Sequence, residues 1–155
     1  MIEMNKEMRI KNYTTSIPWA KTVYEIEQML TSMGADAILK NYRGDGRVEA
    51  LSFQYNRHGY KLPANSEKCS AKLREIGEYK SRPRQWLDDQ AERVAWRVIK
   101  DWLEAQFALI QIGQAEVEQV MLPYMWNGRQ SLYEVLKKDD FKALEGRRDN
   151  KEDSE

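Results

Sequence analysis

The apolar residues of this chain change their spacing along its length, and these changes outline a series of helices and strands. Starting at Trp19, an apolar side chain recurs every three or four positions, which predicts a helix over 20–33. Gly34 follows directly and is a typical residue for ending a helix. Thr22 and Glu25 have the spacing of a capping box, in which two side chains bond free backbone N–H groups. We therefore expect them at the helix start.

A second region of helical spacing is much longer. Residues 84–112 contain neither proline nor glycine, and Gly113 comes next. Their apolar side chains cover about half of the helical circumference, which suits a central helix that packs on more than one neighbour. Shorter helices are predicted over 66–77, with Ser66 at its start, and over 116–121, ended by Pro123.

Between these helices, the spacing is typical of strands. Residues 36–42 and 47–55 flank an Asp-Gly pair, which is a strong signal for a β-hairpin, and a short strand over 60–62 follows another turn. In 47–55, Glu49, Leu51, Phe53 and Tyr55 are the larger alternating set and are expected on the core side. Residues 9–15 are also compatible with a strand. The prediction is a meander of three or four antiparallel strands.

Near the C-terminus, Ser131 and Glu134 form a second capping box that opens a final helix to about Leu144. The predicted fold class is α+β, with an N-terminal antiparallel β-meander and one helix, then a long central helix and smaller C-terminal helices. One domain is expected over 8–145. The charged residues 146–155 are expected to be a disordered tail.

Charge and cysteine content narrow the functional classes. The chain has 25 Lys and Arg against 25 Asp and Glu, but residues 1–100 hold 18 against 13 and residues 101–155 hold 7 against 12. This asymmetry is compatible with an electrically polarised molecule.

The single cysteine excludes an intramolecular disulfide and favours a reducing compartment. No apolar run approaches the length of about 18 residues that a membrane span needs. We expect a cytoplasmic protein without membrane contact.

Several segments resemble a group of small proteins of unknown activity from phages and mobile elements. The similarity lies in the run QAERVAWRVIKDWLEAQ over 90–106, in Gly113, and in Leu-Pro-Tyr-Met over 122–125. Near the start and in the middle, the matching residues are Thr22, Glu25, Ile26, Leu30, Gly34, Ala35 and the segment 62–65. The resemblance covers about residues 20–136. It implies a phage or prophage setting, and it transfers no functional residue.

A stretch rich in basic and aromatic residues is the first candidate site. Cationic side chains can neutralise phosphates, and an exposed indole can stack on an unpaired base. The candidate residues for binding DNA or RNA are Arg82, Arg84, Trp86, Arg93, Arg97 and Lys100. The last three share one helical stripe. The alternative is a solvated helix face on which Asp89 pairs with Arg93 and Asp101 with Arg97.

A second candidate is the apolar segment around Pro123. Tyr124, Met125 and Trp126 belong to residue types that are enriched at protein contacts. If the segment is exposed, it suits a protein-binding module that inhibits a host defence system, as anti-CRISPR proteins do. If it folds inward, it closes the core. The acidic C-terminal half is a further candidate surface for a host protein.

No residue pattern argues for catalysis, a metal or a cofactor. His58 is the only histidine, and Cys69 shares a helical face with apolar residues, which favours a buried structural role. The acidic pairs at 88–89 and 139–140 point in different directions on a helix. We expect a non-enzymatic protein, and the sequence leaves its oligomeric state open.

Overall fold

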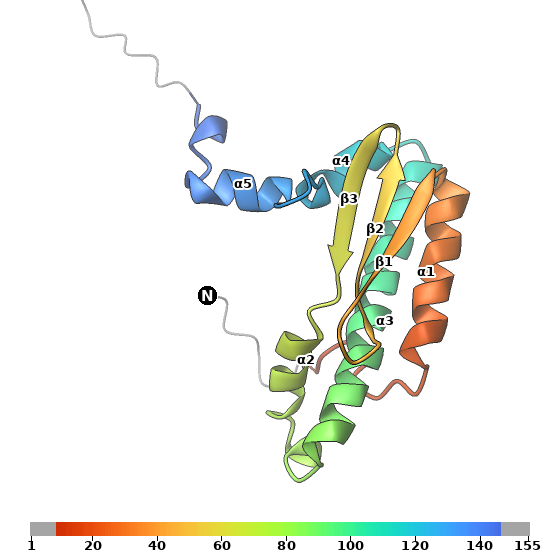
Figure 1. Ribbon diagram of the computed structural model, residues 1–155, viewed down its shortest axis with the longest axis vertical. Coiled ribbons are helices and arrows are strands. Elements are labelled where there is room, and N and C mark those ends of the chain that lie inside the picture. Colours follow the sequence, from red (N-terminus) through yellow and green to blue (C-terminus); the bar gives the residue numbers. More distant parts are fainter. Residues whose placement is uncertain (1–8, 147–155) are drawn as a thin grey trace, which may run out of the picture.

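The computed structural model describes residues 9–146 and has the predicted α+β architecture (Figure 1). The predicted disordered tail lies outside the described residues except for Gly146. The elements, in chain order, are α1 (Trp19–Met33), β1 (Ala37–Tyr42), β2 (Val48–Tyr55), β3 (His58–Pro63), α2 (Ser66–Leu73), η1 (Gly77–Tyr79), α3 (Arg84–Gln111), α4 (Val117–Met121), η2 (Leu122–Tyr124), α5 (Leu132–Lys138) and η3 (Lys142–Leu144). The strands and the long helix lie close to where the spacing predicts them.

The three strands form an antiparallel sheet in the order β1-β2-β3, as a meander requires. Asn56 and Arg57 join β2 to β3 with φ angles of 47° and 70°, the left-handed conformation of a tight hairpin turn. In β2, Ala50 lies opposite Asn41 and Val48 opposite Tyr42, so Glu49 is an extra residue that forms a β-bulge.

This bulge corrects part of the prediction for β2. Leu51 and Phe53 are buried as expected, but Val48 is also buried although it belongs to the opposite alternating set. An extra residue shifts the alternation by one position, which turns Val48 toward the core and leaves Glu49 exposed. Alternation alone does not reveal a bulge.

Helix α3 is the element on which the others pack. Figure 1 shows it running behind the sheet and beside α1, with α2 against its N-terminal half. In the main core, Trp96 and Leu103 of α3 are fully buried, together with residues of α1 and β2. The Trp96 indole N–H donates to the backbone oxygen of Val48 at 3.3 Å, which ties the helix to the β1–β2 hairpin. A second cluster, around Leu73 and Leu87, joins α2 to the start of α3.

The C-terminal part leaves this body as an arm. An isolated bridge pairs Met125 with Tyr60 of β3, and the Trp126 amide donates to the Gly59 oxygen at 2.8 Å. Beyond this joint, α5 projects to one side of the molecule and has no buried residue (Figure 1). Ser131 caps α5 as predicted, since its hydroxyl accepts from the Glu134 amide at 3.2 Å.

Four further local predictions are wrong. The helix predicted over 66–77 ends at Leu73, and Asn65 instead of Ser66 is at its N-cap position. Residues 9–15 form turns instead of a strand, because Asn12 adopts φ 65° and its side chain donates to Asp101 of α3 at 2.7 Å. Thr22 does not cap α1, which begins at Trp19 and buries Thr22 inside the helix. The last helix ends at Lys138 instead of about Leu144, because residues 140 and 141 both have positive φ.

Within residues 9–146, no helix is both long enough and apolar enough to span a membrane.

Candidate nucleic-acid interface

The six basic and aromatic candidate residues fall into separate environments along α3. In the middle of the helix, two cations meet one carboxylate of α1. The Glu25 oxygen Oε2 lies 3.0 Å from Arg97 Nη1 and 2.8 Å from Lys100 Nζ, and Lys100 also pairs with Glu104 at 2.9 Å. Only 18% of the Arg97 side chain and 14% of the Lys100 side chain are exposed. Nucleic-acid binding through the stripe would require these cations to be free, but at these two positions they are largely covered and paired.

The pairing has a measurable electrostatic consequence. The hydrogen bond from Lys100 is the main cause that holds the pKa of Glu25 below its usual value of 4.5, with Arg97 acting in the same direction against desolvation. In turn, the hydrogen bond from Glu25 raises the pKa of Lys100. These charges stabilise the contact between α1 and α3.

Arg93 has a different role. Its Nε donates to the side-chain oxygen of Gln90 at 2.9 Å, and the amide group of Gln90 donates to the backbone oxygens of Tyr13 and Thr15. Gln90 is buried, so Arg93 supports a polar link between α3 and the N-terminal turns. No carboxylate in the described part of the chain lies within ion-pair distance of Arg93.

The other three candidates lie at the N-terminal end of α3 and are more open. The Arg82 guanidinium lies 4.6 Å from the centre of the Trp86 ring, and Trp86 contacts Tyr79 edge-on at 4.9 Å. The Arg84 side chain is 83% exposed, and its only described ion pair is a long one of 3.8 Å to Asp88. The three residues therefore form one neighbourhood, separate from Arg93, Arg97 and Lys100.

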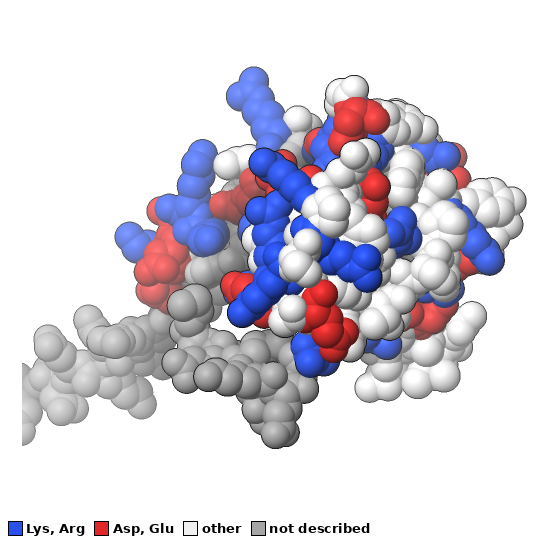
Figure 2. All heavy atoms as spheres, turned by 90° about the horizontal axis from the view of Figure 1, so that it is seen from below, with Lys and Arg blue, Asp and Glu red and all other residues white. Residues whose placement is uncertain are grey.

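Two further cations that the sequence reasoning missed, Lys72 and Arg74, share this end of the molecule. The turn at η1 reverses the chain, so the end of α2 lies near the start of α3. We call the exposed residues Lys72, Arg74, Lys80, Arg82 and Arg84 the basic end. Figure 2 views the molecule from this end and shows Lys and Arg side chains at several points, with some Asp and Glu between them. The high density of Lys and Arg over 72–84 is the signal that could have indicated it.

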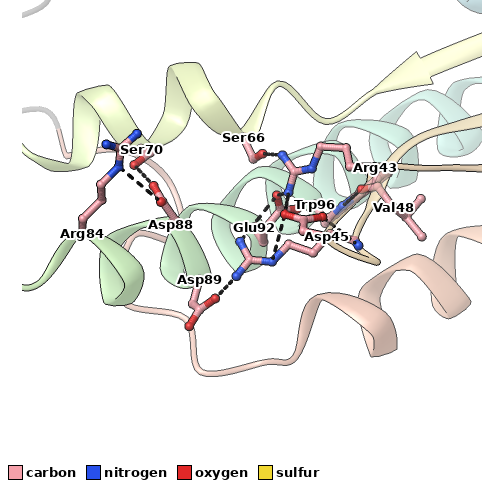
Figure 3. Close-up of polar contacts among 11 residues, drawn as sticks. Arg43, Asp45, Val48, Ser66, Ser70, Arg84, Asp88, Asp89, Glu92 and Trp96 are labelled. Carbon is pink, nitrogen blue, oxygen red and sulfur yellow. Dashed lines mark hydrogen bonds and ion pairs between the residues drawn. The ribbon is translucent and has the colours of Figure 1, made fainter.

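A polar cleft opens beside the basic end, between the β1–β2 hairpin, α2 and α3 (Figure 3). Arg43 of the hairpin forms an ion pair with Glu92 of α3 and donates to the Ser66 hydroxyl at 2.8 Å. Arg47 pairs with Asp89. Glu92 is only 1% exposed, and its charge and hydrogen bond raise the pKa of Arg43 against the opposing effect of burial. The cleft has a volume of about 510 Å³.

The segment around Pro123 is half-buried and joins the arm to the body. The Tyr124 ring meets Trp102 of α3 edge-on at 5.5 Å, and the Lys61 ammonium lies 4.5 Å from the centre of the Trp126 ring. Together with the bridge from Met125 to β3, these contacts leave Tyr124, Met125 and Trp126 half-buried, whereas Leu122 remains 44% exposed. The segment is closer to the expected core arrangement than to an open docking loop.

The chemistry of the remaining candidates is limited. Burial raises the pKa of Cys69 to about 11, so its thiol stays protonated and is a poor nucleophile at neutral pH. Among residues 9–146, no group of three or more His, Cys, Asp and Glu is arranged to hold a metal ion.

Comparison with known proteins does not assign the chain to a family or suggest a function. No protein-family profile, curated protein or solved structure matches the chain. The phage or mobile-element setting therefore stays a prediction from the sequence, and any function rests on the geometry described above.

The Glu25 contact predicts a specific pH dependence. Glu25→Gln should lower the free energy of unfolding by about 1 kcal/mol at pH 7, because ion pairs of this exposure contribute up to that amount. A lowered pKa in the folded state means that the stabilisation is present above pH 4.5 and is lost as the pH falls through the folded pKa. Urea unfolding from pH 7 to pH 3 should therefore show the two proteins converging in acid.

The matched control is Glu49→Gln, which removes an exposed carboxylate from the bulge of β2. It should change the free energy of unfolding by less than about 0.5 kcal/mol at any pH in this range. A Glu25→Gln deficit that stays constant down to pH 3 would contradict the ionic role of Glu25.

Proposed function

We propose that this protein is a non-enzymatic accessory protein of a phage or mobile element that binds nucleic acid through its basic end. The observation that supports this most directly is the group of five exposed cations around one turn of the chain, with Arg82 stacked on Trp86. Phosphates attract such a group because each contact releases condensed counterions. The proposal moves the interface away from the middle of α3.

The paired state of the stripe supports this change of location. Arg97 and Lys100 already have a carboxylate partner in Glu25, and most of their surface is covered. A phosphate could engage them only by displacing Glu25 and leaving its charge without a partner, which is unfavourable. At the basic end, Arg74, Lys80 and Arg82 form no ion pair with any carboxylate over 9–146, whereas Lys72 pairs with Glu75 and Arg84 with Asp88 at more exposed positions.

The aromatic contact favours single-stranded over double-stranded nucleic acid. Trp86 is half-buried and one face of its ring is covered by the guanidinium of the exposed Arg82, so the flat group nearest the solvent is that guanidinium. Flat aromatic and guanidinium groups stack on unpaired bases, and this stacking contributes about 1–3 kcal/mol per base. In a duplex, the base faces are already covered by their neighbours.

The basic end is tested by removing two of its charges. Arg82→Ala combined with Arg84→Ala should weaken binding of a short single-stranded oligonucleotide by about tenfold or more. The slope of log affinity against log salt should fall in magnitude by about 0.7 for each lost phosphate contact. Fluorescence anisotropy over a salt series measures both quantities.

Lys137→Ala combined with Lys138→Ala is the matched control, because it removes the same charge from exposed positions on the arm. This control should bind like the unmodified protein. Equal weakening by the two double substitutions, or no binding by the unmodified protein at low salt, would refute the basic end as the interface.

A second candidate function is protein binding, for example as an anti-CRISPR-like inhibitor of a host defence system. The arm favours it, because four of its apolar side chains are more than one-third exposed: Tyr133, Val135, Phe141 and Leu144. Because α5 has no buried residue, its exposed apolar side chains do not stabilise a core, and such side chains often mark a surface that contacts another protein. Tyr124, Met125 and Trp126 would then position the arm instead of contacting the partner.

This candidate predicts a separation between stability and partner binding. Val135→Asp combined with Leu144→Asp should change the free energy of unfolding by less than about 0.5 kcal/mol, since both positions are exposed. The same change should abolish co-purification of a specific host protein. Leu39→Asp, at an exposed apolar position on β1, is the control and should retain it. Co-purification that survives the change in the arm, or that Leu39→Asp also abolishes, argues against the arm as the docking site.

A further inference from the structure

One edge of the sheet has no partner in the described part of the chain. At the other edge, β3 receives the bridge from Met125 and the hydrogen bond from the Trp126 amide. β1 pairs with β2 on one side, and no strand over 9–146 pairs with its other side. An edge strand points a row of backbone N–H and C=O groups outward, and these groups can pair with another strand. The open edge of β1 is therefore a place where a strand can be added.

β1 has few of the features that usually prevent such pairing. Its residues, Ala-Ile-Leu-Lys-Asn-Tyr over 37–42, include neither proline nor glycine. The bulge in β2 lies opposite the end of β1, so residues 37–41 pair regularly. The single charge of the strand, Lys40, is neutralised by Glu27 of α1 at 2.9 Å. Leu39 and Tyr42 are more than half exposed, so the edge is apolar as well as open.

A groove follows this edge, and α1 forms its second wall. Its volume is about 720 Å³. One wall consists of Ile38, Leu39, Lys40 and Tyr42 of β1, and the other of Tyr24, Glu27, Gln28, Thr31 and Ser32 of α1. The α1 residues share one helical face, which is separate from the face that Val23, Ile26 and Leu30 bury in the core. The groove face of α1 is thus left for a neighbour other than the sheet.

The dimensions of the two layers leave room for one more strand. Helices pack about 8–10 Å apart and strands lie about 4.8 Å apart, so a pair of helices backs about four strands. The sheet has three strands, and Figure 1 shows α1 on the β1 side of the layer behind it. A fourth strand beside β1 lies over the groove face of α1. A second copy of the chain fits less well, because antiparallel pairing through β1 brings a second α1 into the same layer.

From these observations, we infer that the groove binds an extended segment of a partner protein as a fourth strand beside β1. Backbone hydrogen bonds to β1 hold the segment, and its side chains alternate between two environments. Lys40 faces α1, so its neighbour Leu39 faces the other side of the sheet. One alternate set of partner side chains therefore contacts α1, and the other set contacts Leu39.

The charges of the groove define the partner further. Lys40 and Glu27 neutralise each other, and every other residue that lines the groove is uncharged. The centre of the bound segment is therefore uncharged and partly apolar, since an unpaired charge there would lose water without gaining a partner. The groove shares no residue with the basic end or with α5, so this inference does not depend on nucleic-acid binding.

The probe is a library of random peptides of about nine residues, displayed on yeast and selected with the purified protein. Enriched peptides should carry apolar residues at alternate positions and no charge at the centre. One of them is then synthesised in two N-methylated forms, with the methyl groups on either its odd-numbered or its even-numbered residues. Only alternate N–H groups of an added strand face β1, so one form should lose at least about tenfold in affinity and the other should stay within about threefold.

A substitution in the α1 wall tests the location. Thr31 is exposed and lines the groove, so Thr31→Trp should fill it and weaken binding of the unmethylated peptide by at least about tenfold. Ala20→Trp is the matched control, because it adds the same side chain at an exposed position of α1 outside the groove. The control should bind the peptide like the unmodified protein. Circular dichroism verifies that both variants are folded.

Three results would overturn the inference. The first is a selection that enriches no peptide more strongly on the unmodified protein than on Thr31→Trp. The second is equal affinity of the two methylated forms, because binding is then not that of an added strand. The third is a dimer of the unmodified protein in sedimentation that Thr31→Trp dissociates, because a second copy then occupies the edge. None of these results bears on the basic end, which the oligonucleotide titration tests separately.

Discussion

The fold depends on one constraint: the charged residues of the long helix α3 that are covered by its neighbours must have a polar partner, which is a residue of opposite charge for Glu92, Arg97 and Lys100 and the Gln90 side chain for Arg93. Glu92 is almost fully buried, and the β1–β2 hairpin supplies Arg43 and Arg47 to it. One turn beyond, Arg97 and Lys100 are covered by α1, which supplies Glu25. A buried charge without a partner is strongly destabilising. The same ion pairs that neutralise α3 therefore also select how the sheet and α1 lie on it.

This constraint separates the structural from the available charges. In the middle of α3, which the sheet and α1 cover, positive groups are engaged and stabilise packing. At its N-terminal end the chain turns at η1, little covers the surface, and the positive groups of the basic end remain open to solvent. The cleft lies at the boundary between these regions, with the buried Arg43–Glu92 pair inside and Arg84 at the rim. The proposed nucleic-acid interface at the basic end follows from this division.

Sequence spacing predicted contacts within an element well, because they depend on periodicity. The long helix, the hairpins and the cap at Ser131 are examples. Contacts between elements could not be predicted in this way. Asp89 was considered as a partner of Arg93 one turn away, but it pairs with Arg47, 42 positions earlier. Glu25 was assigned to a capping box and instead faces α3. For the candidate site, spacing identified residues near the basic end. It did not reveal which cations of α3 are paired with carboxylates from other elements.

The difference between engaged and open cations can be measured by chemical modification. Lys80 is exposed without a described carboxylate partner, whereas Lys100 is largely covered and bonded to Glu25 and Glu104. Brief acetylation of the folded protein, followed by mass spectrometry of its peptides, compares their rates within one sample. We expect Lys80 to react at least about tenfold faster, since the cover over Lys100 keeps the reagent away and the hydrogen bonds from its ammonium to Glu25 and Glu104 raise its pKa, which leaves less of the reactive neutral amine. Equal rates for the two lysines in the folded protein would contradict the account.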